Sequence, residues 1–237
     1  MGPRAYPALV AESVGTFLFF FVGAGSVVLV AQAGDAGPGL VGVALAHGLV
    51  LAVLVSALGS VSGGHFNPAV TVAVRLAGGI EWSRAAAYVL AQLIGAVAAG
   101  LALRAVFPEA AVADSNLGTP ALAEGIEVWQ GIAIEAVLTV VLVLAVFGTA
   151  IDPRAPRLGG MAIGLAVAAD ILMGGPLTGA AMNPARWFGP AVAAGAFDNW
   201  YVWWVGPLIG AAVAAVIYRY ALEFSAEEGI SPGTPEG

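Results

Sequence analysis

Two copies of the tripeptide Asn-Pro-Ala carry the most specific chemistry in this chain, one at Asn67-Pro68-Ala69 and one at Asn183-Pro184-Ala185. Asn is a preferred N-cap residue and Pro is favoured at the first position of a helix, so each copy predicts a helix start. As a cap, the Asn side chain uses its oxygen to accept hydrogen bonds from its own helix. Its NH2 group is then left to donate to another partner.

The apolar segment that begins at each tripeptide is short. Residues 67–76 and 183–194 would each form roughly 15 Å of helix. Neither can cross the hydrocarbon core of a membrane alone, but end to end they would cover its thickness of about 30 Å. If they enter from opposite faces, both N-terminal ends meet near the midplane, where two amides and two positive dipole ends converge.

Ionisable residues stand inside otherwise apolar stretches, where each needs a partner or a function. We expect Glu12 and Glu135 to accept backbone N–H groups from the irregular segments before the tripeptides, as structural supports and not as catalysts. Arg186, which ends the second motif, would donate to a passing solute and repel cations. Asp170 has two open interpretations, a hydrogen bond to an external loop or a place in the wall of a vestibule.

The composition indicates a membrane protein. Of the 237 residues, 60% are hydrophobic and 10% are charged, against about 25% charged in soluble domains. The chain has no Cys and two His, His47 and His65, which excludes thiol nucleophiles and leaves no set of metal ligands. We therefore expect no metal, no cofactor and no enzymatic activity, and we expect His65 to pack or to bond within its loop. The net charge of −7 argues against nucleic acid as a partner.

Six apolar stretches are long enough, or nearly so, to span a bilayer as helices. They cover residues 8–31, 40–58, 85–107, 129–151, 159–173 and 200–222, of which the fifth is short. The sequence therefore predicts an all-α membrane protein with one channel domain over residues 1–228. Residues 229–237, rich in Gly, Pro, Ser and Glu, are expected to form a disordered tail.

The arginines indicate the orientation, because cytoplasmic loops carry the excess of basic residues. With six spans, one side holds Arg4, Arg75, Arg84, Arg154, Arg157 and Arg219, and the other holds Arg104 and Arg186. We expect both termini in the cytoplasm and residues 108–128 outside. All eight basic residues are Arg, and this composition suggests the cell membrane of a prokaryote.

The two halves of the chain repeat each other. Glu12 precedes Asn67 as Glu135 precedes Asn183, and the third and sixth spans share the sequence Leu-Ile-Gly-Ala. Each half, about residues 8–107 and 129–222, holds three spans, an odd number, so the halves must be inverted relative to each other. Inverted repeats with interrupted segments in matching positions indicate a midplane site between the halves. The shared glycines, Gly95 and Gly210, are expected to allow close helix packing.

The expected midplane site suits water. A water molecule between the two Asn amides would have its oxygen held by two donors, so it could not also accept from a neighbouring water. A proton-conducting chain would be interrupted there, and the positive helix ends would repel cations. A coupled carrier would need ionisable groups facing this site, whereas Asn is neutral. The residues therefore predict a passive water channel, with a coupled transporter and a structural membrane protein as the alternatives.

The segments around both tripeptides resemble the major intrinsic protein family, the aquaporins and glycerol facilitators. They read SGGHFNPAVT from Ser62 to Thr71 and GPLTGAAMNPAR from Gly175 to Arg186, and WWVGPLIG from Trp203 to Gly210 resembles the family's sixth helix. The resemblance covers nearly the whole chain. It implies an aquaporin-like right-handed bundle of six tilted helices plus two re-entrant half-helices, assembled in the lipid as a homotetramer with one pore per subunit.

The resemblance also implies an outer selectivity constriction. Counted from the two motifs, its four positions fall on His47, Ile171, Ala180 and Arg186. This set matches neither strict water channels nor glycerol facilitators, and it resembles the plant tonoplast intrinsic proteins, some of which also pass ammonia. Trp187 and Ala191, after the second motif, favour water over glycerol, and residues 108–128 lack the additional His of some ammonia-conducting members. A water channel is expected, with a channel that also conducts ammonia, urea, hydrogen peroxide or glycerol as the alternative.

Overall fold

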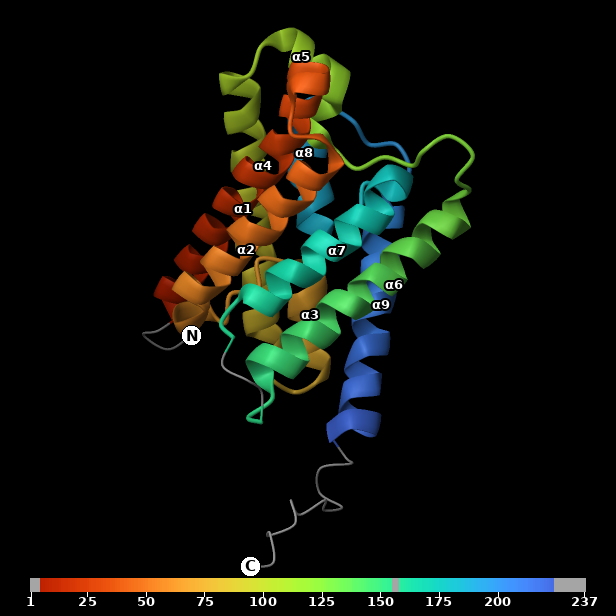
Figure 1. The fold of residues 1–237 in the computed structure, drawn as a ribbon. Helices are drawn as coiled ribbons and strands as arrows, with labels where there is room; N and C mark the ends of the chain where they lie inside the picture. Colours follow the sequence, from red (N-terminus) through yellow and green to blue (C-terminus); the bar gives the residue numbers. More distant parts are fainter. Residues whose placement is uncertain (1–4, 155–157, 224–237) are drawn as a thin grey trace, which may run out of the picture.

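The computed structural model describes residues 5–154 and 158–223 and shows a bundle of tilted helices (Figure 1). The long helices are α1 (Ala5–Ala33), α2 (Gly39–Ser62), α4 (Trp82–Val106), α6 (Val128–Val146), α7 (Met161–Thr178) and α9 (Val202–Ile217). α6 and α9 run on into π-helical turns, η3 (Phe147–Ile151) and η4 (Tyr218–Glu223). Within the described residues, six helices are long and apolar enough to cross a membrane, as the sequence predicts.

The fifth span is longer than the sequence predicts. α7 continues through Gly174, Gly175 and Pro176 to Thr178, instead of ending at residue 173, and Gly179 caps it with a φ of 80°. Pro176 removes one backbone donor but does not stop the helix here. The hydroxyl of Thr178 donates to Glu135 on α6, which fixes the last turn of α7 in place.

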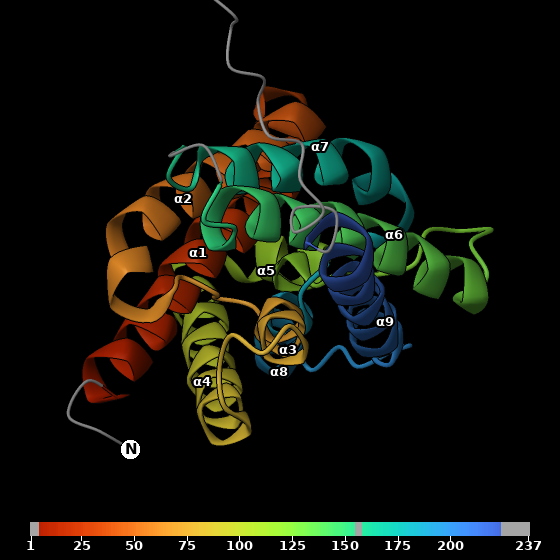
Figure 2. The ribbon, with the colours of Figure 1, turned by 90° about the horizontal axis from the view of Figure 1, so that it is seen from below.

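Two short helices lie in the middle of the bundle. α3 (Pro68–Leu76) and α8 (Pro184–Ala194) begin at the motif prolines and are too short to span a membrane. Seen from below, α3 and α8 lie one behind the other (Figure 2), while the side view separates them along the bundle (Figure 1). Their N-terminal ends face each other in the interior, as the inverted repeat requires.

The long helices pack in the same way in both halves. α1 packs against α4 and α6 packs against α9, while α2 and α7 pack against each other across the halves. A Cβ atom on Gly95 would lie 2.2 Å from the Ser13 oxygen, and one on Gly210 would lie 2.2 Å from the Ala136 oxygen. Only glycine fits at these two places, so the predicted role in close packing is confirmed.

The connection between α4 and α6 folds back over one end of the bundle. It contains the short helix α5 (Glu109–Ser115) and the 3-10 turn η2 (Asn116–Gly118), which contact α1 and α8. Gly118 has a φ of 69°, and a Cβ atom on it would lie 2.9 Å from the Ala24 oxygen. α1 begins and η4 ends at the opposite end of the bundle (Figure 1).

Candidate functional site

Both motif asparagines cap their own short helices. Asn67 Oδ1 accepts hydrogen bonds from the backbone of Ala69 at 2.8 Å and of Val70 at 3.4 Å. Asn183 Oδ1 accepts from the backbone of Ala185 at 3.0 Å and of Arg186 at 3.3 Å. The two ends of each amide therefore have the expected separate roles, since the side-chain oxygen accepts from the N-terminal backbone of its helix and the NH2 group bonds elsewhere.

The NH2 groups are not wholly free, and here the expectation needs correction. Asn67 Nδ2 donates to the Met182 oxygen at 2.9 Å, and Asn183 Nδ2 donates to the Phe66 oxygen at 3.0 Å. Each amide thus cross-links its own loop to the opposite one. Because an amide nitrogen carries two hydrogens, one N–H remains on each Asn for a third partner.

The residues before each Asn have a strained backbone. Phe66 has a φ of 45° and Met182 has a φ of 52°, in the left-handed region that favours glycine. Both sit one position before an Asn, and their carbonyl groups accept the two cross-links. This conformation must therefore be held by other contacts, and the carboxylates supply them.

Glu12 and Glu135 hold the two irregular segments in matching ways. Both side chains are fully buried. Glu12 accepts from the backbone of His65 at 3.0 Å and of Phe66 at 2.8 Å. Glu135 accepts from the backbone of Ala181 at 2.9 Å and of Met182 at 2.7 Å. The contacts are those expected of structural carboxylates.

Sequence reasoning missed the second layer of this support. Ser62 donates to Glu12 at 2.6 Å, and Thr178 donates to Glu135 at 2.7 Å. The signal was available, because both hydroxyls stand five residues before a motif Asn. The two hydroxyl residues are in turn bound through their carbonyl groups by Tyr88 and Trp203, and Gln92 donates to Glu12.

The structure brings His47 and Arg186 together. Arg186 Nε lies 3.1 Å from His47 Nε2, and Arg186 Nη1 donates to the Gly118 oxygen at 2.8 Å. His47 Nδ1 lies 2.9 Å from the Val43 oxygen. A guanidinium can only donate and a carbonyl can only accept, so His47 is a neutral imidazole with its proton on Nδ1. Both ring nitrogens are used, whereas Arg186 Nη2 has no partner among the described residues.

Three cavities follow one another through the bundle. An outer cavity of about 470 Å³ lies under η2, and an inner cavity of about 550 Å³ lies at the other end. Between them is a chamber of about 20 Å³ that contains both motif asparagines, which is close to the space that a single water needs. The chamber shares His47, Ile171 and Arg186 with the outer cavity, and Gly64, His65, Val70, Val146 and Ile163 with the inner one.

The other two residues of the predicted constriction also line this chamber. Ile171 on α7 and Ala180 in the loop before α8 are 4% and 2% exposed. Ala180 has a φ of 43°, which turns its backbone as Gly64 is turned in the first repeat. The structure therefore places all four predicted residues in the wall of the chamber, and three of them, His47, Ile171 and Arg186, also line the outer cavity.

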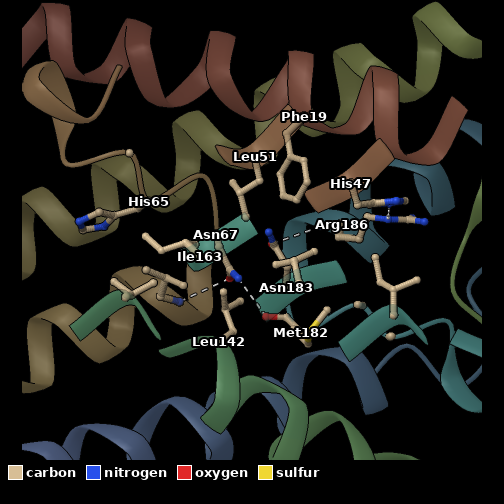
Figure 3. Close-up of a pocket in the computed structure, with 17 residues that line it drawn as sticks. Phe19, His47, Leu51, His65, Asn67, Leu142, Ile163, Met182, Asn183 and Arg186 are labelled. Carbon is tan, nitrogen blue, oxygen red and sulfur yellow. Dashed lines mark hydrogen bonds between the residues drawn. The ribbon is translucent and has the colours of Figure 1, made fainter. Parts of the chain in front are cut away.

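His65 lies at the inner end of the chamber. Figure 3 shows His65 on one side of the two asparagines and His47 with Arg186 on the other. His65 Nδ1 is 3.1 Å from the hydroxyl of Thr71, and this hydroxyl donates to the backbone oxygen of Asn67. The hydroxyl proton is thus used, so Nδ1 is the donor in this contact. His65 both bonds within its loop, as expected, and lines the chamber.

The rest of the chamber wall is apolar. The side chains come from α1, α2, α6 and α7, and they include Phe19, Leu51, Leu142, Ile163 and Val167 (Figure 3). A passing polar molecule therefore meets polar groups at Arg186, at the two asparagines and at His65. Within residues 5–154 and 158–223 no group of three His, Asp or Glu side chains could hold a metal ion.

Comparison with known proteins gives a consistent result. The model of the family described as "Major intrinsic protein" matches residues 3–218. Aquaporin TIP4-4 of Zea mays is 49% identical over 218 residues, which cover 89% of this chain and 84% of that protein. Probable aquaporin TIP3-2 of Arabidopsis thaliana is 45% identical over 240 residues, covering 95% of this chain and 87% of that protein.

A solved structure shares the fold. The X-ray structure of the aquaglyceroporin from Plasmodium falciparum aligns with a TM-score of 0.85 over 95% of this chain and 100% of that one. The sequence identity is 21%, so this likeness bears on the arrangement of helices and not on the solute.

Proposed function

The chain belongs to the major intrinsic protein family, and from that premise we infer that its three cavities form a pore that conducts water passively and excludes protons and ions. It is an integral, multi-pass membrane protein and a channel, not an enzyme. Relatives at 43–49% identity are named aquaporins, which supports the same function here.

The observation that carries the proposal is the pair of asparagine amides. Each has one N–H in a cross-link and one left for the chamber, and the positive ends of α3 and α8 begin at the two asparagines that line it. A water between them donates outward on both sides and accepts from neither neighbour. Water passes in this orientation, and a continuous proton-conducting chain does not form.

We propose that His47, Ile171, Ala180 and Arg186 select the solute. Because His47 uses both ring nitrogens on protein partners, it presents a ring edge and no free acceptor to the pore. The free Nη2 group of Arg186 is then the donor that a solute meets there, and its charge repels cations. Ile171 and Ala180 contribute an apolar part of the same wall.

The alternative is a channel that also conducts small neutral solutes such as ammonia, urea, hydrogen peroxide or glycerol. The small side chain of Ala180 and the apolar side chain of Ile171 favour such passage over a strict water filter. Relatives that share the tonoplast intrinsic protein names support a filter of this subgroup.

A coupled transporter is not supported by the same contacts. The buried Glu12 and Glu135 are fully engaged with the loops that they hold, so they are not available to carry a coupling ion through the pore. A structural membrane protein would have no use for the buried guanidinium of Arg186.

We further propose a homotetramer in the membrane, with one pore per subunit and both termini in the cytoplasm. The start of α1 and the end of η4 lie at the same end of the bundle, which supports placing both termini on one side of the membrane (Figure 1). Of the arginines that indicate orientation, Arg4 and Arg157 lie outside the described residues, as does the predicted tail at 229–237. The relatives named above come from plants, so a prokaryotic cell membrane rests on composition alone.

The experiment is osmotic shrinkage of proteoliposomes, with water, ammonia, urea and glycerol measured in parallel. We expect fast water flow with a low activation energy and no proton current. Shrinkage no faster than that of empty liposomes would remove the channel proposal. Arg186→Val should raise the cation leak, whereas Arg84→Val, an exposed site on α4, should not. An unchanged leak in Arg186→Val would remove Arg186 from the exclusion role.

A further inference from the structure

One carboxyl group inside the membrane-spanning part has no function in the pore described so far. Asp170 lies in the middle of α7 and is 4% exposed. Its Oδ2 atom is enclosed and has no hydrogen-bond partner among the described residues. Neither of the two sequence interpretations fits, because within residues 5–154 and 158–223 Asp170 bonds to no external loop, and it is absent from the lining of the outer cavity.

The helix register places Asp170 at the seam between α6 and α7. Gly174, one turn further on, faces α6, since a Cβ atom there would lie 2.4 Å from Leu138 Cδ1. Thr178, another turn on, donates to Glu135 on α6. Asp170 heads this row, and the two helices lie side by side along it (Figure 1). Its neighbours Val167 and Ile171 line the chamber, so the carboxyl stands at the edge of the pore wall.

The other buried carboxylates of the described spans are compensated. Glu12 and Glu135 each accept hydrogen bonds from two backbone N–H groups and from at least one side chain. Asp170 accepts none, and the charged group that acts on it, Glu135, has the same sign. An unpaired charge in such a place is far less favourable than the neutral acid.

We propose that Asp170 is a specificity-determining residue that holds a proton at the edge of the pore wall, and that its loss of this proton weakens the cation barrier of the pore. The proposal rests on the pore function above. As a neutral acid, Asp170 adds no negative charge to the wall of the pore. As a carboxylate, it would place a negative charge next in sequence to Ile171, which lines the chamber, and so lower the barrier to a cation in the pore.

Asp170 can change its charge without breaking a contact, unlike the groups around it. On α6, Glu135 is bound to Thr178 and to two backbone N–H groups. On α2, His47 is fixed by the Val43 oxygen and by Arg186, and on α8, Arg186 is bound to His47 and Gly118. A titration of any of these would cost existing hydrogen bonds, whereas Asp170 has none to lose.

The charge state can be tested without measuring transport. A protonated carboxyl in an apolar site gives an infrared carbonyl stretch distinct from that of a carboxylate. We expect Asp170→Asn, in the full chain in lipid at neutral pH, to remove one such band. Asp198→Asn, an exposed acid in the loop before α9, should remove none. A spectrum in which Asp170→Asn removes no acid band would overturn the proposal.

The effect on selectivity needs a second measurement. In proteoliposomes, we expect the wild-type cation leak to rise about tenfold from neutral to alkaline pH, corresponding to about 1.4 kcal/mol, and to stay flat in Asp170→Asn. Asp170→Leu fills the seam without a polar group and replaces the Asn variant if that variant does not fold. Its cation leak should also be independent of pH. An equal rise in wild type and in a folded Asp170 variant would contradict the proposal. If the wild-type protein conducted no water, the channel function would be contradicted. The infrared measurement would still test the charge state of Asp170 in that case.

Discussion

Arg186 Nε and His47 Nε2 lie 3.1 Å apart, so the two polar residues of the proposed constriction are bonded to each other. They come from α8 and α2, 139 residues apart in sequence. The contact removes the free nitrogen of His47 and fixes one edge of the guanidinium. The width and the donors of the constriction therefore depend on this pair as a unit, and not on two independent side chains.

His47→Ala should separate these effects. The change removes a ring from the constriction and frees Arg186 Nε, so both the width and the number of donors increase. We expect urea and glycerol permeability to rise about tenfold, with a smaller change for water, in stopped-flow light scattering of proteoliposomes. Unchanged urea and glycerol flow would show that His47 does not narrow the path.

Ala180→Phe should act in the opposite direction. A phenyl ring in place of the methyl group would project from the loop before α8 into the chamber that Ala180 lines. We expect passage of urea and glycerol to fall more than passage of water, measured in the same assay. Ala169→Phe, on the exposed face of α7, is the matched control and should change neither. Equal loss of water and of larger solutes would place Ala180 away from the constriction.

Glu135→Gln and Glu12→Gln test the supports of the two loops. Gln keeps the shape but presents an NH2 group where backbone N–H groups point, so buried donors lose their acceptor. We expect each to lower the free energy of unfolding by about 3–5 kcal/mol, as for a broken buried charge network. The melting temperature in detergent measures this, and the exposed Glu81→Gln is the control. A large loss in only one of the two variants would contradict their equivalent roles.

Much of the fold was predictable because it follows from local rules. Apolar runs of about 20 residues gave the spans, and Asn-Pro gave the starts of α3 and α8. The repeat of Gly95 at Gly210 indicated the close contacts of both halves. The end of α7 was not predictable in the same way, because the helix runs past Pro176 to Thr178, and no local rule indicates that Thr178 bonds to Glu135 on α6.

The candidate site was predictable in its members but not in its bonds. Counting from the motifs identified His47 and Arg186, yet nothing local says that they bond to each other or that Gly118 holds the guanidinium. The cross-links of Asn67 and Asn183 were missed for the same reason. These contacts join segments more than a hundred residues apart, or from a separate loop, and exist only once the two repeats have met.

The inner end of the bundle offers a pH-dependent contact between Asp152, just outside the fourth span, and the end of the sixth span. Asp152 follows η3 and accepts hydrogen bonds from Arg154 and, at 2.5 Å, from the hydroxyl of Tyr218 in η4. Arg154 first, and Tyr218 second, hold the pKa of Asp152 well below its ordinary value. Tyr218 also packs against Phe147, with ring centroids 4.9 Å apart. The carboxylate therefore ties the end of the last helix to the end of α6.

The sign of this linkage predicts an acid-labile contribution to stability. A folded-state pKa below the unfolded value means that the carboxylate stabilises the protein above about pH 4 and loses this effect as the pH falls further. We expect Asp152→Asn to lower the melting temperature by a few degrees at neutral pH, and the gap to wild type to close in acid. Tyr218→Phe should lower the melting temperature by less, and this difference should also close in acid. Asp35→Asn, at an exposed position, should not change the melting temperature. A gap that stays constant down to the acid range would mean that Asp152 contributes through packing and not through its charge.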